Sequence, residues 1–133
     1  MSTFQIEIVT PTEVKYAGPA RMLTVQGVMG QMGILAQHAP LLSMLDPGLL
    51  SYTEKDGTVS RMAAGAGFVQ VAQNKAICLV DFAERPDEID ATAARARADE
   101  LAKQIPSADT LEREKLREEL KKAQARLAVA AGR

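Results

Sequence analysis

Two spacings of apolar residues divide the chain. Between residues 4 and 82 the apolar side chains fall two apart or in short runs, as in Phe4, Ile6 and Ile8. A spacing of two predicts β-strands, because successive side chains of a strand point to opposite faces. Turn-forming stretches such as Asp-Pro-Gly at 46–48 separate the runs. Many short strands at this rhythm predict a sandwich or a barrel.

After Pro86 the spacing becomes helical. The sequence is rich in Ala, Glu, Lys, Arg and Leu and has no glycine until Gly132, which is the composition of helices. Apolar residues recur every three or four positions and so share a face in each of two stretches. These residues are Ala94, Ala98, Leu101 and Ile105 in the first stretch, and Leu116, Leu120, Ala123, Leu127 and Ala130 in the second.

A break separates the two helical stretches. Pro106 interrupts the pattern, and Asp109 or Thr110 follows as an N-cap for the second helix. The prediction is an α+β protein, with an N-terminal antiparallel β-sandwich over residues 1–86 and a C-terminal antiparallel two-helix hairpin over residues 87–133. Because both stripes are narrow and rich in alanine, each buries little area at about 25 cal/mol per Å². We expect such a hairpin to dock weakly and to be able to rearrange.

Composition and charge exclude several classes of protein. The chain is 47% apolar and 25% charged, which is typical of a globular protein. Sixteen basic residues oppose seventeen acidic ones, so no long-range field favours nucleic acid or an anionic membrane. The sequence contains no secretory signal and no run near the roughly 20 apolar residues that span a bilayer. We expect a cytosolic or peripheral protein without nucleic-acid partners and without direct insertion into a bilayer.

Few residues offer chemistry. Cys78 is the only cysteine and His38 the only histidine, which excludes an internal disulfide and a Cys/His zinc cage within the chain. His38 lacks an evident nucleophile or orienting acid, so a structural or interface role is favoured over catalysis. Cys78 lies in a strand-like run and is predicted to be a small buried residue. We expect no catalytic residues, no metal and no cofactor, and the glycines of 27–33 and 65–67 are interpreted as turn or close-approach positions.

Three segments resemble a known family. Residues 30–42 read Gly-Gln-Met-Gly-Ile-Leu-Ala-Gln-His-Ala-Pro-Leu-Leu and are followed by Leu-Asp-Pro-Gly at 45–48. The second match is residues 67–81, and the third runs from Glu84 through Ile89 and Asp90 into the alanine-rich hairpin. Together they are similar, in order and spacing, to the epsilon subunits of bacterial F-type ATP synthases, and the chain is identified as a member of that family.

The resemblance implies a function. It implies a non-catalytic rotor subunit of the central stalk, which couples proton-driven rotation to ATP synthesis on the cytoplasmic face of the bacterial inner membrane. The sandwich would bind the gamma subunit and rest on the ring of c subunits. The hairpin would either fold against the sandwich or extend toward the alpha and beta subunits and restrain ATP hydrolysis.

The resemblance also implies contact residues. Those expected at the rotor interface are Gly30, Gln31, Gly33, His38, Ala39, Pro40, Leu41 and Leu42. Those expected to reach the catalytic subunits from the extended hairpin are Arg113, Lys115, Arg117, Lys121, Lys122 and Arg126. Relatives often carry an acidic residue where this chain has Gln31, so a ring contact through a carboxylate is not expected.

A free-standing ATP sensor is the alternative function, because some relatives hold ATP between hairpin and sandwich. Glu84, Ile89, Asp90 and Arg126 match that nucleotide site, but Ala93 stands where relatives place an arginine. A guanidinium binds phosphate through two charge-assisted hydrogen bonds that alanine cannot supply. Two further positions also differ from the arginines of relatives, namely Glu100 and Lys122. We therefore expect weak or unmeasurable ATP binding, with Arg97, one helical turn after Ala93, as the residue that could substitute.

Overall fold

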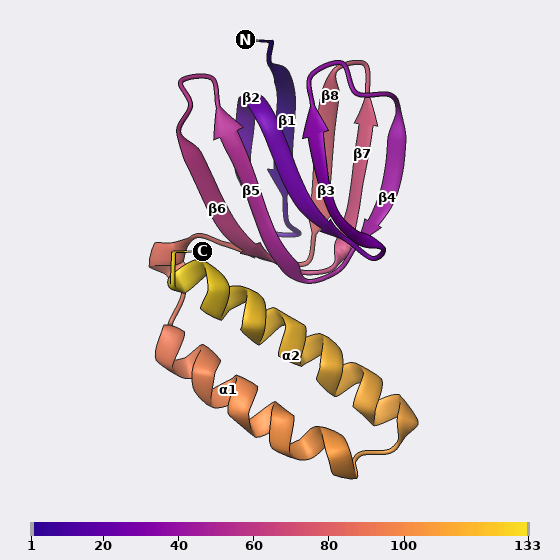
Figure 1. Cartoon of the computed structure of the whole chain (residues 1–133), viewed down its shortest axis with the longest axis vertical. Helices are drawn as coiled ribbons and strands as arrows, with labels where there is room; N and C mark the ends of the chain where they lie inside the picture. Colours follow the sequence, from indigo (N-terminus) through magenta and orange to yellow (C-terminus); the bar gives the residue numbers. More distant parts are fainter. Residues whose placement is uncertain (1, 133) are drawn as a thin grey trace.

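The structure, a computed structural model, describes residues 2–132 and contains nine strands, two α-helices and two 3₁₀ turns within that range. The strands are β1 Phe4–Val9, β2 Val14–Gly27, β3 Gly30–Leu35, β4 Leu41–Leu45, β5 Gly48–Glu54, β6 Val59–Ala64, β7 Gly67–Ala72, β8 Lys75–Val80 and β9 Ala83–Glu84. The helical elements are η1 Pro86–Glu88, α1 Ala91–Gln104, η2 Ile105–Ser107 and α2 Thr110–Ala130. Figure 1 shows the strands as a two-layered sandwich with the hairpin across one end.

The long strand β2 joins the two layers. Its first half pairs with β1, and its second half pairs with β3 on one side and β5 on the other. The register with β5 shifts between Ala20 and Met22, so Arg21 forms a β-bulge. A bulge bends a strand and increases its twist. This bend lets β2 leave the layer β1-β8-β7-β4 and continue into the layer β3-β2-β5-β6-β9.

The predicted sandwich is confirmed, with one difference in strand direction. All pairs are antiparallel except β1 with β8, which run parallel in register from Gln5 with Lys75 to Val9 with Leu79. Antiparallel order is required only where a short turn joins two strands. Most of the sandwich separates β1 from β8 in the chain, so no short turn fixes their relative direction. Alternation of apolar residues predicts strands but not how distant strands pair.

The core between the layers is entirely apolar. Within residues 2–132 no polar or charged residue is buried. The largest of its side chains with less than 2% exposure are Ile6, Ile8, Leu23, Ile34, Leu50 and Met62, and the rings of Phe4 and Tyr52 are 3% and 2% exposed. Cys78 is also fully buried, as predicted, and burial raises the pKa of its thiol to about 12. A thiol with that pKa stays protonated at neutral pH and is not a nucleophile.

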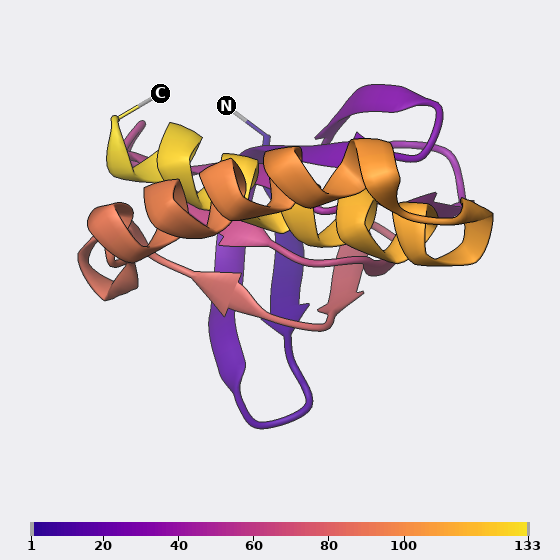
Figure 2. The same cartoon turned by 90° about the horizontal axis from the view of Figure 1, so that it is seen from below.

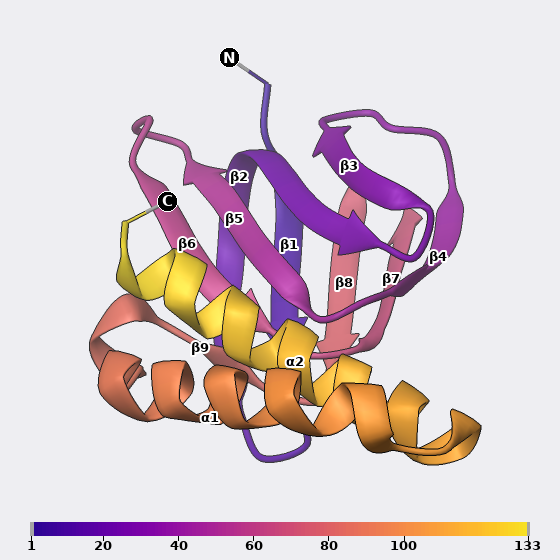
Figure 3. The same ribbon diagram turned by 60° about the horizontal axis from the view of Figure 1, so that its bottom comes forward.

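The hairpin forms as the sequence predicts. Asp90 and Asp109 are the N-caps, and their carboxylates accept hydrogen bonds from Ala93 N at 3.0 Å and Glu112 N at 2.9 Å. Such caps stabilise a helix by about 1 kcal/mol. The predicted stripe of α1 is buried at Ala94, Ala98 and Leu101. Figures 2 and 3 show α1 and α2 side by side, with α2 between α1 and the sandwich.

Helix α2 has a second buried face that the sequence analysis missed. Ala125 and Val129 are 6% and 1% exposed and pack with Ala63 of β6, and the half-buried Leu49, Phe82 and Ile89 pack around them. The predicted stripe of α2 is buried only at Ala123 and half-buried at its other positions. The helix therefore divides its small apolar surface between α1 and the sheet. Neither contact contains a wide apolar seam, which agrees with the expected weak docking.

Candidate functional site

Two ion pairs connect α2 to the sandwich. Lys121 Nζ lies 3.0 Å from Asp46 Oδ2, in the segment between β4 and β5. Arg126 donates to both oxygens of Glu84, at 2.7 and 3.4 Å, and its guanidinium carbon lies 4.4 Å from the centre of the Phe82 ring. All four ionic side chains are between 30% and 50% exposed. Partly exposed pairs contribute about 0.2–1 kcal/mol each, so they orient the hairpin without fixing it strongly.

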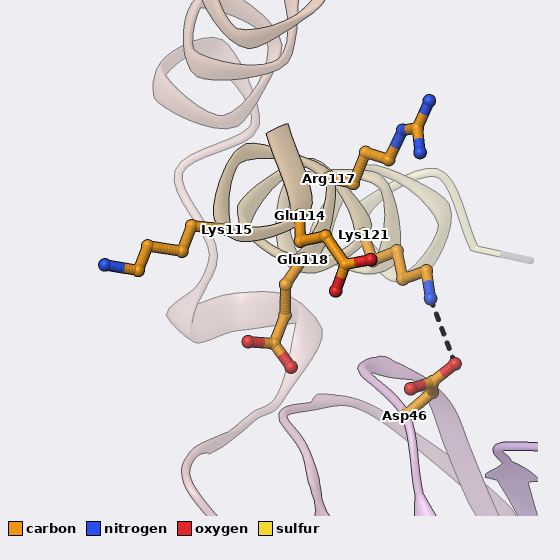
Figure 4. Close-up of a pocket in the computed structure, with 6 residues that line it drawn as sticks. All are labelled: Asp46, Glu114, Lys115, Arg117, Glu118 and Lys121. Carbon is orange, nitrogen blue, oxygen red and sulfur yellow. Dashed lines mark hydrogen bonds and ion pairs between the residues drawn. The ribbon is translucent and has the colours of Figure 1, made fainter. Parts of the chain in front are cut away.

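The first ion pair borders a shallow pocket of charged side chains. It has a volume of about 470 Å³ and is lined by Asp46, Glu114, Lys115, Arg117, Glu118 and Lys121. Figure 4 shows Lys121 bridging to Asp46 while Lys115 and Arg117 point away from the sandwich. Three acidic and three basic groups line it, so it has no strong preference for either charge.

The residues expected to contact the catalytic subunits do not act alike in the docked hairpin. Lys121, Lys122 and Arg126 bond to Asp46, Glu119 and Glu84, respectively. Arg113 donates to the carbonyls of Ile105 and Ala108 and so holds the turn between the helices. Of these six residues, only Lys115 and Arg117 are both exposed and without an ion pair to another described residue.

The residues matched to the nucleotide site of relatives do come together. Glu84, Ile89, Asp90 and Arg126 line one pocket of about 340 Å³. Ala93 and Arg97 line it too, with Glu88, Ala94 and Ala123. Four of its polar groups are already engaged, because Asp90 caps α1, Arg126 is paired with Glu84, and Glu88 accepts from Arg85 N and Lys15 Nζ. That these residues form the remnant of a nucleotide site stays a prediction.

The linker before the pocket is held against the sandwich. Glu88 accepts hydrogen bonds from Arg85 N at 2.8 Å and from Lys15 Nζ at 2.9 Å. The hydrogen bond from the Arg85 amide, and after it the one from Lys15, hold the pKa of the Glu88 carboxyl below its ordinary value. Arg85 donates in turn to the Lys15 carbonyl and to the Tyr52 hydroxyl. These hydrogen bonds fix the direction in which the chain leaves the sandwich. The segment that follows Glu88 takes no part in them.

The segments expected at the rotor interface lie at opposite ends of β3. Gly30 and Gln31 begin the strand, and the exposed His38, Ala39 and Pro40 follow its far end, about 17 Å away at 3.3 Å per residue. The turn lies at residues 28–29, so Gly33 is a strand residue rather than a turn residue, which corrects the interpretation from sequence. Among the glycines of residues 27–33, Gly30 is the one with a positive φ, +132°, a conformation that favours glycine.

An apolar outer face adjoins the second of these segments. Leu42 and Met44 of β4 are 70% and 61% exposed, and Leu79 of β8 is 38% exposed. Phe68 of β7 connects them, since it pairs with Met44 on one side and with Leu79 on the other. Only Leu42 was singled out from the sequence. For Phe68 the sequence holds a signal, because Phe68 and Val69 are adjacent and both apolar, which places an apolar side chain on each face of β7.

These features define a class of protein. It is a small β-sandwich with an apolar core and an apolar outer face, and it carries a helical hairpin across one end. An exposed apolar face of this kind is typical of a module that binds other macromolecules. Within residues 2–132 no cluster of three or more His, Cys, Asp or Glu is placed to hold a metal ion. None of the described helices is long and apolar enough to cross a membrane.

Comparison with known proteins identifies the family. Residues 3–86 match the model of the ATP synthase delta/epsilon chain β-sandwich domain. The chain is 39% identical to the ATP synthase epsilon chain of Herpetosiphon aurantiacus, over 95% of this chain and 93% of that one. It is 35% identical to the ATP synthase epsilon chain of Shouchella clausii, over 98% and 96%. The chain belongs to the ATP synthase delta/epsilon family.

Solved structures support the fold. A chain in the cryo-EM structure of the Euglena gracilis mitochondrial ATP synthase superposes with a TM-score of 0.86 at 21% identity, covering all of this chain and 83% of that one. A chain of the Tetrahymena thermophila mitochondrial ATP synthase central stalk and c-ring superposes with a TM-score of 0.60 at 14% identity, covering 96% and 93%. The likeness in both extends over sandwich and hairpin together.

Proposed function

We propose that the chain is a non-catalytic subunit of the central-stalk rotor of an F-type ATP synthase, where it couples proton-driven rotation to ATP synthesis. The observation that carries the proposal is the family match, which spans the whole sandwich and is accompanied by relatives named ATP synthase epsilon chain along nearly the full chain. In this role the chain is peripheral, on the cytoplasmic face of the bacterial inner membrane. It performs no bond chemistry of its own.

The gamma subunit is the proposed partner of the apolar outer face formed by Leu42, Met44, Phe68 and Leu79. Exposed apolar patches of this kind are covered in assemblies, because leaving them in water costs about 25 cal/mol per Å². His38 to Leu42 lead directly into this face, so their expected place at the rotor interface is retained.

The c-subunit ring is the proposed partner of the β2–β3 turn. Met29 at its tip is 96% exposed, and Gln31 follows it as an exposed neutral residue. Contact with the ring would then depend on an apolar tip and on amide hydrogen bonds rather than on a carboxylate. This contact should vary little with ionic strength, since no charge is involved.

The hairpin is the proposed regulatory element. To extend toward the alpha and beta subunits it must break the pairs of Lys121 with Asp46 and of Arg126 with Glu84 and expose Ala125 and Val129. These contacts are few and individually weak. Extension would release Lys121 and Arg126 to pair with acidic groups of the catalytic subunits, and that pairing would restrain ATP hydrolysis.

The alternative, a free-standing ATP sensor, has the pocket of Glu84, Ile89, Asp90 and Arg126 in its favour. The pocket also contains Ala93 in place of a phosphate-binding arginine, and Arg126 is paired with Glu84. We expect calorimetric titration with ATP and magnesium to give weak or unmeasurable binding. A dissociation constant in the low micromolar range would overturn this expectation and direct attention to Arg97.

Affinity purification separates the two functions. The tagged full-length chain, expressed in place of the native copy, should bring down the gamma, alpha, beta and c subunits from detergent-solubilised membranes. A tagged cytosolic protein of similar size serves as the control. Recovery of the chain alone, in the soluble fraction, would contradict the rotor function and favour the sensor.

A further inference from the structure

The chain between the sandwich and α1 is fixed to the sandwich as far as Glu88. Strand β9 pairs with β6, and Pro86 has a fixed φ at the start of the 3₁₀ turn η1. Glu88 ends this turn and accepts hydrogen bonds from Lys15 Nζ with both of its carboxylate oxygens, each at 2.9 Å. These contacts make residues 83–88 part of the sandwich.

Lys15 depends on its contact with Glu88. The side chain of Lys15 is only 8% exposed, and the other carboxylate that it pairs with, that of Glu13, lies 3.9 Å away. A nearly buried charge that loses its partner is far more costly than an exposed ion pair is stabilising. The Lys15 carbonyl also accepts from Arg85, which donates in addition to the hydroxyl of the core residue Tyr52. Lys15 therefore holds the linker at two points.

The two residues after Glu88 join two separately bonded units. Ile89 and Asp90 are both extended, and Asp90 belongs to α1 as its cap. Within residues 2–132, no backbone hydrogen bond joins residues 83–88 to α1. The ψ of Ile89 and the φ of Asp90 can therefore change without breaking the turn before them or the helix after them. Short segments with this property are where hinge motions take place.

Helix α1 does not tie the hairpin to the sandwich. In the described part of the chain, no hydrogen bond or ion pair joins α1 to a strand, and its buried residues belong to neither apolar cluster of the sandwich. Figures 2 and 3 show α2 between α1 and the sheets. The hairpin is thus held by contacts of α2, namely those of Lys121, Arg126, Ala125 and Val129. Once these contacts open, the linker determines how the hairpin moves.

A pivot at the turn between the two helices would break more contacts. Arg113 donates there to the carbonyls of Ile105 and Ala108, at 3.3 and 3.1 Å. Asp109 caps α2 at the same place, with its carboxylate 2.9 Å from Glu112 N. The joint before α1 contains no such bonds.

We propose that the hairpin pivots on Ile89 and Asp90, and that Lys15 is the positioning residue that sets this pivot by holding Glu88 on the sandwich. The moving unit then begins after Glu88, beyond the boundary at residue 86 that the sequence predicts. That the hairpin leaves the sandwich at all rests on the proposed function. The position of the pivot rests on the contacts of the linker.

Spin-label distances in the isolated full chain test the pivot. Labels are attached to cysteines introduced at Val59 of β6, Asp87 of the linker and Asp99 of α1, all of which are exposed. The background is Cys78→Ala, which removes the one native thiol. One distance then reports on the linker, from 59 to 87, and the other on the hairpin, from 59 to 99.

The hairpin is released by charge repulsion. Lys121→Glu and Arg126→Glu together place carboxylates against the acidic partners of both ion pairs. The 59–87 distance should stay unchanged, while the 59–99 distance should broaden and shift to longer values. A shift at 87 would place the pivot before Glu88. A 59–99 distance that is unchanged, both here and in Ala125→Glu, would show that α1 does not leave the sandwich. Either result would overturn the inference.

Substitution of Lys15 tests its role. In the released chain, Lys15→Met should broaden the 59–87 distance as well, whereas Lys15→Arg, which keeps a cation for Glu88, should leave it narrow. In the docked chain, Lys15→Met should change neither distance, because α2 still holds the hairpin. Lys55→Met, which removes an exposed lysine from the turn between β5 and β6, is the matched control. Glu88→Gln breaks the same contact from its exposed side and takes the place of Lys15→Met if that variant does not fold.

Equal 59–87 distances in the released Lys15→Met and Lys55→Met chains would contradict the role of Lys15. None of these distances needs a partner subunit. A pivot elsewhere would overturn the inference and leave the rotor function standing. Failure of the chain to co-purify with the gamma subunit would overturn the rotor function and leave the measured pivot unaffected.

Discussion

Individual residues determine how closely the strands approach. A Cβ built on Gly67 would lie against the carbonyl oxygen of Leu79 and 2.8 Å from Val80 Cα, so the backbone of β8 passes where a side chain would be. A Cβ on Gly33 would meet only the terminal methyl of Met22, at 2.9 Å. Backbone cannot move aside, whereas the end of a methionine can. Both glycines lie in strands, but only Gly67 is required by the close approach of a neighbouring backbone.

We expect Gly67→Ala to destabilise the sandwich by about 1–3 kcal/mol or more, as overpacking does, and Gly33→Ala to change its stability by less than about 1 kcal/mol. Urea denaturation of both variants with the native chain measures the difference. A Gly67→Ala variant as stable as the native chain would show that β7 and β8 are not so closely packed.

The linker residue Glu88 gives a pH dependence with a defined sign. The pKa of its carboxyl is below the ordinary value of 4.5 in the folded chain. Its contribution to stability is therefore present above the unfolded pKa and is lost as the pH falls through the folded pKa. NMR titration of Glu88 should give a midpoint below 4.5, and Glu88→Gln should flatten the acid limb of the stability profile. A midpoint at or above 4.5 would contradict the observed hydrogen bonds.

At the scale of elements, the sequence predicts what local chemistry determines. The cap Asp109 and the stripe Ala94, Ala98 and Leu101 are local in the chain, and they are confirmed. The docking face of Ala125 and Val129 depends on Ala63 of β6, which no periodicity within α2 reveals. Alanine is a good helix former in any environment, so its burial against a distant strand leaves no trace in the local pattern.

A charge on that docking face should release the hairpin. Ala125→Glu keeps a good helix former but buries a carboxylate among apolar groups, which costs several kcal/mol unless the helix moves away. We expect a spin-label distance between α2 and β6 to shift to long values, with the sheet intact by circular dichroism. Gln124→Glu, which adds the same charge at an exposed neighbour, is the control. An unchanged distance in Ala125→Glu would show that α2 docks by other contacts.

At the scale of the whole molecule, the sandwich and the hairpin have separate sources of stability. The main core lies between the two sheets and contains no hairpin residue. Removal of the hairpin would expose to solvent the sandwich residues of the small apolar cluster, namely Ala63, Leu49 and Phe82. The division at residue 86 thus remains our prediction, with a core that can support it.

We therefore expect residues 1–86 alone to fold and to unfold cooperatively. Deletion of residues 87–133 should preserve assembly and coupling but should alter the regulation of ATP hydrolysis. Thermal unfolding followed by circular dichroism, with the native chain as control, measures the first part. A truncated chain without a cooperative transition would show that the hairpin is needed for the sandwich.

The most direct test of the rotor function is ATP-driven proton pumping in inverted membrane vesicles depleted of this subunit. Addition of the purified chain should restore pumping per ATP hydrolysed to the level of undepleted vesicles, because in the proposed function the subunit connects the gamma subunit to the c ring. The chain alone should hydrolyse no ATP. Pumping that is normal without the chain, or that does not recover when it is added back, would contradict the proposed function.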